Sequence, residues 1–421
     1  MSLFQKKTDK PQSIELSQAH QKPRLILICV LIVIAAVAFA TGVTSCLNGE
    51  PGWRAIEAST GEVNCGEDFV FQYFFPASNS AASKMSKQIT ALYGEAAEKA
   101  YWLFNADGTH EEIKNVAYLN RHPNETVEID PVLYNALDLL TGGGNRLLYL
   151  AEVYSQYDNV FLSELDSEAA AWDPARSEEN RDYVNQILLF SNDPAHVYLE
   201  LLENYRVCLT VSDAYLAFAD ENEFTNFIDF HWTKNAFIVD YFAQLMIDAG
   251  YTDGYIGSYD GFTRNLMNKE ETFSFNVFDR IGNGIELVAR MEYAEPMSIV
   301  FLRNYPMSNK DRWNYYIYAD GTGATAYVDP TDGLSKTADT NLVSYATDHG
   351  CAEILMEMIP AYVTDTLDET ALQSMAERQI YSIWCKDTTV CYNDPDLQLL
   401  DLLNGEDLQY TQSLVQGVPE F

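Results

Sequence analysis

The stretch NAFIVDYFAQLMIDAGYTDGYIGSYDGFTRNL, residues 235–266, decides the fold class. Its first half predicts an amphipathic helix, because apolar residues recur on one helical face at Ile238, Phe242, Leu245 and Met246. Gly250 is expected to end that helix, since a helix C-terminus often needs a positive φ. A short strand over residues 254–257 and the polar turn SYDG follow. A helix, a strand and a tight turn with an acid and a glycine is typical of nucleotide sites.

The rest of the chain mixes helical and strand patterns. FVFQYFF, residues 69–75, predicts a buried strand, and residues 80–104 predict a helix. Asp130 and Pro131 suit the N-cap and first position of another helix. Further strands are expected at residues 196–202, 206–212, 272–278, 285–291, 297–303, 313–318, 325–328 and 342–346. The order of these elements predicts an α+β fold in one continuous domain.

The charge of the chain restricts its partners. The 421 residues carry a net charge of -36, and the first 24 residues are basic. A protein that binds a nucleic acid needs a basic surface, so nucleic acid is not an expected partner.

An uncharged segment follows the basic N-terminus. LILICVLIVIAAVAFATGV, residues 25–43, is long enough to span a bilayer, and basic residues before it predict a cytoplasmic N-terminus. The alternative is a lipoprotein signal ending at Cys46, because Val43-Thr44-Ser45-Cys46 is similar to a lipobox. Either anchor places the large domain outside the cytoplasm, at the cell membrane.

The cysteines show no metal-binding spacing. Beyond Cys46 the chain has five cysteines without a CxxC pair, so a zinc knuckle is not expected. Cys385 and Cys391 could form a disulfide across KDTTV, and buried or free thiols are the simpler alternative.

Several short motifs occur in the order found in a known family. They are Leu119-Asn120, VEIDP at 127–131, TGG at 141–143, DFHWTKNAFIVD at 229–240, Asp260-Gly261, AYVDPTDG at 326–333 and DHGCAE at 348–353. In this order, over residues 68–365, the chain resembles the ApbE-like family, the FAD:protein FMN transferases. The resemblance implies one flavin-transferase-like domain, and the expected organisation is a cytoplasmic N-terminus (1–24), an anchor (25–46), a linker (47–67), the domain (68–365) and a C-terminal extension (366–421).

The resemblance also implies a function. Members transfer FMN from FAD to a Ser or Thr of a partner protein, release AMP and use a divalent cation, usually Mg²⁺. By position, the implied catalytic residues are Lys234, Asn235 and Asp329, and the implied metal ligand is Asp348. The implied cofactor-binding residues are Tyr259, Asp260, Gly261, Arg264 and Asp240. Asp260, Asp329 and Asp348 should then lie near a common cleft.

Ordinary structural roles compete with these assignments. Asp348 is equally suited to cap a helix, and Asp260 suits a turn. Lys234 and Arg264 could be surface or paired charges instead of phosphate ligands, and Tyr259 could pack in the core instead of stacking on a flavin.

The sequence also departs from the family pattern at chemically important positions. Asn235 stands where the family has a lysine, Ala326 where it has a histidine, and Ala352 where it has a metal-binding threonine. The alternative function is therefore a non-catalytic descendant that binds flavin, another ligand or a partner protein in the same cleft. A surface structural protein without a cleft is a third interpretation.

Overall fold

The decisive stretch folds into a helix and a hairpin. In the computed structural model, which describes residues 51–58, 63–76, 80–267, 272–282 and 284–416, α9 (Lys234–Asp248) is followed by β6 (Gly254–Ser258) and β7 (Phe262–Asn265). Gly250 has φ +80° directly after the helix, as the sequence predicted. Residues 53–74 and 85–421 form one compact unit, and the features below belong to it apart from Gly52, Phe75 and residues 80–84. These belong to the other unit, residues 1–52 and 75–84, which lies largely outside the described residues.

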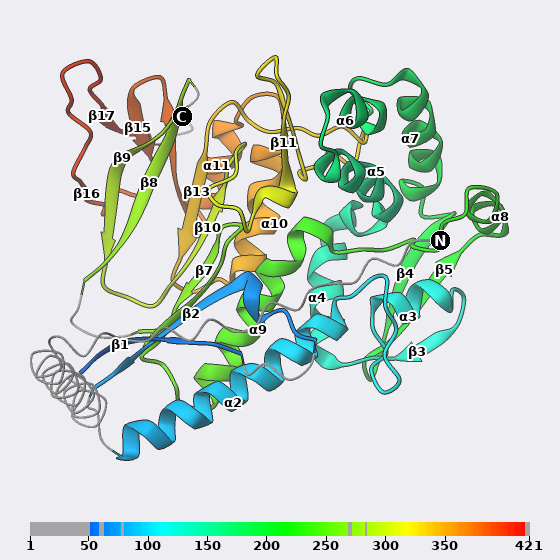
Figure 1. Cartoon of the computed structure of the whole chain (residues 1–421), viewed down its shortest axis with the longest axis horizontal. Helices are drawn as coiled ribbons and strands as arrows, with labels where there is room; N and C mark the ends of the chain where they lie inside the picture. The colour runs from blue at the N-terminus through cyan, green and yellow to red at the C-terminus, as the bar shows by residue number, and fades with distance from the viewer. Residues whose placement is uncertain (1–50, 59–62, 77–79, 268–271, 283, 417–421) are drawn as a thin grey trace, which may run out of the picture. The chain divides into compact units, whose positions relative to one another are not determined.

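β6 and β7 belong to the large sheet. Among the described residues this sheet has nine strands in the order β1-β2-β6-β7-β10-β13-β14-β15-β17 (Figure 1). The remaining strands of the sheet are β1 (Gly52–Ile56), β2 (Phe69–Phe75), β10 (Met297–Leu302), β13 (Leu342–Ala346), β14 (Tyr381–Lys386), β15 (Thr389–Tyr392) and β17 (Thr411–Leu414). Its pairs are antiparallel from β2 to β15, and β15 and β17 are parallel.

Alternation along the strands gives the large sheet two apolar faces. On one face, Ile299, Phe301 and Val343 pack in a core with a second sheet. That sheet consists of β8 (Phe273–Ile281), β9 (Gly284–Tyr293) and β16 (Leu399–Leu400). The other face is covered by α9, α10 (Cys351–Tyr362) and α11 (Glu369–Ala376) (Figure 1).

A helical region precedes α9 in the chain. It contains α2 (Ser80–Leu103), α3 (Val116–Arg121), α4 (Pro131–Thr141), α5 (Ala151–Leu162), α6 (Asp166–Trp172), α7 (Glu178–Ser191) and α8 (Asp213–Glu221). A small antiparallel sheet, β3 (Thr126–Glu128), β5 (Arg206–Val211) and β4 (Val197–Leu202), lies within it. The short hairpin β11 (Tyr315–Ile317) and β12 (Gly323–Thr325) follows β10 in the chain.

Local signals in the sequence predicted many of these elements correctly. β2 and β13 have the predicted bounds, and Asp130 caps α4 by accepting a 2.9 Å hydrogen bond from the backbone N–H of Val132. The sequence also indicates helical character from Arg146 to Tyr154, which is confirmed in part: a 3-10 turn, Leu147–Tyr149, comes first and α5 begins at Ala151. The side chain of Asn145 bonds to the N–H of Leu147 and favours the tighter turn.

The possible disulfide between Cys385 and Cys391 does not form. Both thiols are free and buried in the β14–β15 hairpin. Cys391 pairs with Trp384, the neighbour of Cys385, so the two side chains point to opposite faces of the sheet.

The predicted anchor, residues 25–46, lies outside the described residues. Within the described part of the chain, no helix combines the length and apolar character needed to cross a bilayer.

Candidate functional site

The start of α9 lines a cavity of about 400 Å³, called here the α9 cavity. Lys234, Asn235 and Ile238 contribute one wall, and Asp260 of the β6–β7 turn contributes another. Five aspartates, two lysines and a histidine are among the lining residues: Asp68, Asp107, Asp158, Asp229, Asp260, Lys234, Lys310 and His231. The α9 cavity is therefore polar and predominantly acidic.

The α9 cavity brings together three of the residues implied by the resemblance. The amide of Asn235 donates a 2.8 Å hydrogen bond to Oδ2 of Asp260, and Lys234 lines the same cavity. Oδ1 of Asp260 is buried and has no hydrogen-bond partner among the described residues. Burial raises the pKa of Asp260, against the opposing effects of Ser258, Asn235 and Arg303.

Replacing Asp260 by asparagine should remove a pH-dependent cost of folding. Because burial raises the pKa of Asp260 above its ordinary value of 3.8, its contribution to stability is fully present below that value and is lost as the pH rises through the raised pKa. The Asp260→Asn variant keeps an acceptor for Asn235 without this titration. The free energy of unfolding of the native protein, relative to the variant, should therefore fall as the pH rises above about 4 in urea titrations. A constant difference would contradict the burial of a titrating carboxyl group.

Asp229 and His231 are cavity residues that the sequence analysis missed. The N–H of His231 donates a 2.9 Å hydrogen bond to Asp229, Nε2 lies 3.0 Å from Asp158, and the ring stacks on Tyr154 with centroids 4.3 Å apart. His231 holds φ +45°, an uncommon conformation for a residue with a side chain. Burial raises the pKa of Asp229, with His231 opposing the shift. The sequence offered one signal for these two residues: Asp229 and His231 stand only a few positions before Lys234.

The remaining implied residues lie elsewhere. Tyr259 and Gly261 line a separate cavity of about 350 Å³, and Asp329 lines one of about 750 Å³. Asp348 is exposed on the loop between β13 and α10. Asp260, Asp329 and Asp348 therefore do not meet in one of these cavities. Burial alone would raise the pKa of Asp329, but hydrogen bonds from Lys336 and Thr331 outweigh burial and lower it.

Asp240 and Arg264 hold the N-terminus of α10. Asp240 accepts 2.8 Å hydrogen bonds from the backbone N–H groups of Cys351 and Ala352, and Arg264 lies 2.9 Å from its Oδ1. A Cβ on Gly350 would lie 2.5 Å from Asp240, so this approach requires a glycine. The N-terminus of α10 is thus capped by Asp240 of α9. Capping this helix was the alternative role expected for Asp348.

The Mg²⁺ that the resemblance implies finds no ready-made cluster of carboxylates in the described part of the chain. No group of three or more His, Cys, Asp or Glu side chains in that part of the chain is arranged to hold a metal ion. Asp348 is exposed, and the oxygens of Asp240 already accept bonds from α10 and Arg264.

A buried ion pair fixes the β6–β7 turn. Arg303 and Asp311, 1% and 2% exposed, form a salt bridge, and Arg303 also donates a 2.9 Å hydrogen bond to the carbonyl oxygen of Tyr259. Asp311 in turn accepts backbone N–H bonds from Met307 and Ser308. Asp260 therefore sits on a turn that the ion pair holds in place.

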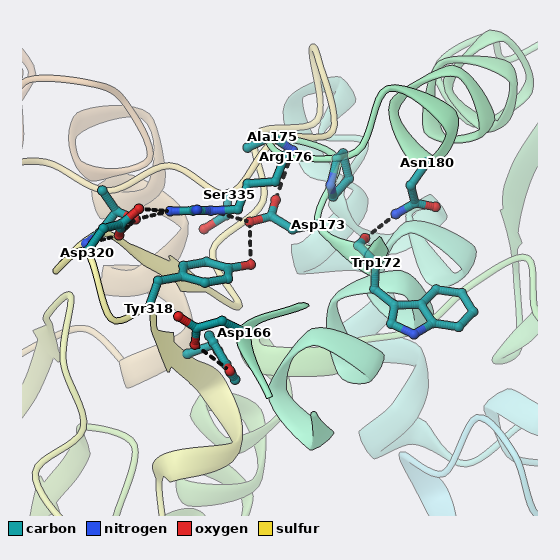
Figure 2. Close-up of polar contacts among 12 residues, drawn as sticks. Asp166, Trp172, Asp173, Ala175, Arg176, Asn180, Tyr318, Asp320 and Ser335 are labelled. Carbon is teal, nitrogen blue, oxygen red and sulfur yellow. Dashed lines mark hydrogen bonds and ion pairs between the residues drawn. The ribbon is translucent and has the colours of Figure 1, made fainter. Parts of the chain in front are cut away.

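The β11–β12 hairpin fixes another wall of the α9 cavity. Trp313 and Asn314, just before β11, line the cavity. Figure 2 shows how the hairpin is held: the Tyr318 hydroxyl donates a 2.8 Å hydrogen bond to Asp173, and Arg176 lies 2.9 Å from Asp320. Two segments separated by about 140 residues thus support the cavity together.

The Tyr318→Phe variant should lose stability through one buried hydrogen bond. Tyr318 and Asp173 are both buried, and a hydrogen bond to a charged group contributes about 1.5–3 kcal/mol. The matched control is Tyr316→Phe, because the Tyr316 hydroxyl bonds to the exposed Asp166 and should contribute about 1 kcal/mol or less. Thermal melting followed by circular dichroism measures both, and equal losses would contradict the role of burial.

Comparisons with known proteins identify the type of fold. No family model matches the sequence, and no curated protein matches it either. Among solved structures, the ApbE protein from Thermotoga maritima is similar, with a TM-score of 0.53 and 13% identity over 80% of this chain and 94% of that one. The flavin transferase ApbE from Vibrio cholerae is similar with a TM-score of 0.51 and 11% identity over 83% of this chain and 96% of that one. The protein therefore has an α+β fold of the ApbE flavin-transferase type.

Proposed function

We propose that this protein is a membrane-tethered, flavin-transferase-like protein that binds a flavin nucleotide in the α9 cavity. The observation that carries the proposal is the meeting of Lys234, Asn235 and Asp260 in one cavity of a flavin-transferase fold. These are the positions that the family resemblance assigns to catalysis and to flavin binding.

The lining of the α9 cavity suggests which parts of FAD it would contact. Lys234 and Lys310 are the lysines available to the pyrophosphate. Asn235 and Asp260 are suited to polar atoms of a ring, because Asn235 carries an amide and Asp260 carries a carboxyl group. The other aspartates oppose an anionic ligand, so binding depends strongly on the two lysines.

The catalytic form of the proposal is transfer of FMN to a Ser or Thr of a partner protein. The acceptor hydroxyl oxygen attacks the phosphorus of the FMN half of FAD, the bond to AMP breaks, and AMP leaves with the electron pair. Asp229 is the buried carboxyl group of the cavity that could take the hydroxyl proton. In the family a divalent metal assists this reaction, and the described residues contain no cluster of three or more His, Cys, Asp or Glu side chains that could hold it.

A non-catalytic flavin- or partner-binding protein is the second candidate. Asp240 bonds to Arg264 and to the first N–H groups of α10. Because both side chains are used in this way rather than for binding a flavin, the second candidate is favoured. Ala326, at the position of the family histidine, is buried and cannot exchange a proton.

Titration of the 421-residue protein with FAD, followed by flavin fluorescence, tests binding. We expect saturable binding, weakened about 10-fold in the Lys234→Met variant because a hydrogen-bonded charge is lost. Lys114→Met, which removes an amine outside the α9 cavity, is the matched control and should bind normally. Absence of saturation at high micromolar FAD would exclude both flavin-binding candidates.

AMP release then separates the two candidates. Bound FAD is incubated with a Thr-containing acceptor, with and without Mg²⁺, and AMP is measured. Release supports the transferase, whereas binding without release supports the non-catalytic protein.

The membrane tether is tested by mass spectrometry of the mature protein. Retention of residues 1–45 supports a transmembrane helix, and a lipid on an N-terminal Cys46 supports a lipoprotein. Either result supports an extracytoplasmic domain, and a soluble mature form lacking both would contradict the tether.

A further inference from the structure

The cavity that contains Asp329 is larger than the α9 cavity. At about 750 Å³ it is in the size range of small-molecule sites, and it is called here the α10 cavity. It lies among the end of α4, the loop after it, the residue that follows α7 and the second half of α10. Its apolar walls are formed by Leu139, Leu147, Met356, Ile359, Pro360 and Val363. A ligand of this cavity therefore needs an apolar body.

The two carboxylates that line the α10 cavity already have cationic partners. Lys336 lies 2.7 Å from Asp329 and also bonds to Asp332, and Arg378 forms an ion pair with Glu357. A cationic ligand would have to displace these partners. The cavity therefore does not favour a cation.

The cationic residue of the lining, Arg146, bonds only to neutral groups in the part of the chain that the structure describes. Its Nε donates a 2.9 Å hydrogen bond to the carbonyl oxygen of Ser191, and its Nη2 donates one of 2.9 Å to that of Val197. The ring of Tyr149 lies against the guanidinium group, with its centroid 3.9 Å from Cζ. Burial lowers the pKa of Arg146, opposed chiefly by Tyr149 and Asp193. The charge of this guanidinium group is therefore incompletely balanced, and an anion beside it would stabilise it.

One edge of the Arg146 guanidinium group is free. Nη1 donates no hydrogen bond to a described residue, and it is accessible, in contrast to the buried and unpaired Nε of Arg303. Ser191, which accepts the bond from Nε, directly precedes Asn192, another residue of the lining. The free edge therefore lies at the Asn192 end of the α10 cavity.

We propose that the α10 cavity binds a monocarboxylate with an apolar body. The carboxylate accepts a hydrogen bond from Nη1 of Arg146, and the apolar body lies against the walls from α4 and α10. A doubly charged phosphate group fits less well, because Arg146 is the single cation of the described lining and Asp329 and Glu357 would repel a second negative charge. This site is separate from the α9 cavity, so the inference does not depend on flavin binding.

Suitable probes are 3-phenylpropanoate and 3-phenylpropanamide, because they have nearly the same shape and only the first is an anion. Binding to the 421-residue protein is measured by isothermal titration calorimetry at neutral pH. The carboxylate should bind saturably and about 10- to 100-fold more tightly than the amide, the difference expected for a hydrogen bond between charged groups. Acetate, which lacks the apolar body, should not saturate the protein at the same concentrations.

Three variants locate the binding site. In Arg146→Met, the affinity for 3-phenylpropanoate should fall to that for the amide. Arg181→Met is the matched control, because Arg181 also donates to two backbone carbonyl oxygens but lies outside the α10 cavity, and it should bind both probes as the native protein does. Met356→Trp fills the cavity from α10 and should abolish saturable binding, with thermal melting confirming that each variant is folded.

The comparison of the two probes needs no variant, so it decides the question even where a variant does not fold. Equal affinity of the native protein for the carboxylate and the amide would overturn the proposal. Unchanged binding in folded Arg146→Met or folded Met356→Trp would also overturn it, as would equal losses in Arg146→Met and Arg181→Met.

Discussion

The Gly261→Ala variant is expected to lose about 3 kcal/mol or more of its free energy of unfolding. Gly261 has φ +117°, and a Cβ there would lie 2.3 Å from the carbonyl oxygen of Phe301 and 2.9 Å from the guanidinium of Arg303. Both neighbours belong to the buried core, so neither can move away at low cost. Urea unfolding followed by circular dichroism measures the loss, and the same variant should weaken FAD binding because Asp260 precedes this glycine.

Gly321→Ala is the matched control for that variant. Gly321 also has a positive φ, +86°, but a Cβ there would meet nothing within 4 Å. The Gly321→Ala variant should lose only about 1–2 kcal/mol of its free energy of unfolding, the penalty for a side chain at a positive φ. Similar losses in the two variants would show that the close approach of β10 to the β6–β7 turn is unimportant.

The Asp311→Asn variant should lose about 3–5 kcal/mol, because it leaves the buried guanidinium of Arg303 without its counter-charge. Asparagine has nearly the same size and shape as aspartate, so the loss reports the charge and the hydrogen bonds lost at the new amide nitrogen rather than the packing. Thermal and urea unfolding both measure it.

Removing both charges should restore much of that stability. In Arg303→Met combined with Asp311→Leu, no unpaired charge remains buried, so the double variant should be more stable than Asp311→Asn. The N–H groups of Met307 and Ser308 still lose their acceptor, so recovery should be incomplete. A double variant less stable than the single one would mean that Arg303 is needed for its bonds to the turn rather than for its charge.

The fold could be predicted where local sequence decides it. Asp130 and Pro131 start α4 because a cap and a preset φ act within one turn. The order of short motifs also indicated the flavin-transferase fold, although each motif alone was weak.

The candidate site was harder to predict because its contacts join distant residues. Asp240 and Cys351 are separated by 111 residues, and the sequence could not show that one caps the helix that begins at the other. Asp229 and His231 were missed for a related reason: their roles depend on Asp158 and Tyr154, which α5 brings to them. The family resemblance placed Lys234, Asn235, Asp260, Asp329 and Asp348 in one site, and it could not show that Asp329 and Asp348 lie outside the α9 cavity.

The cap that α9 provides for α10 has a mechanical consequence. Because the first N–H groups of α10 bond to a carboxylate of α9, the two helices share an anchor and should move as a single rigid lever. The first turn of α9 borders one cavity, and the second half of α10 borders the other.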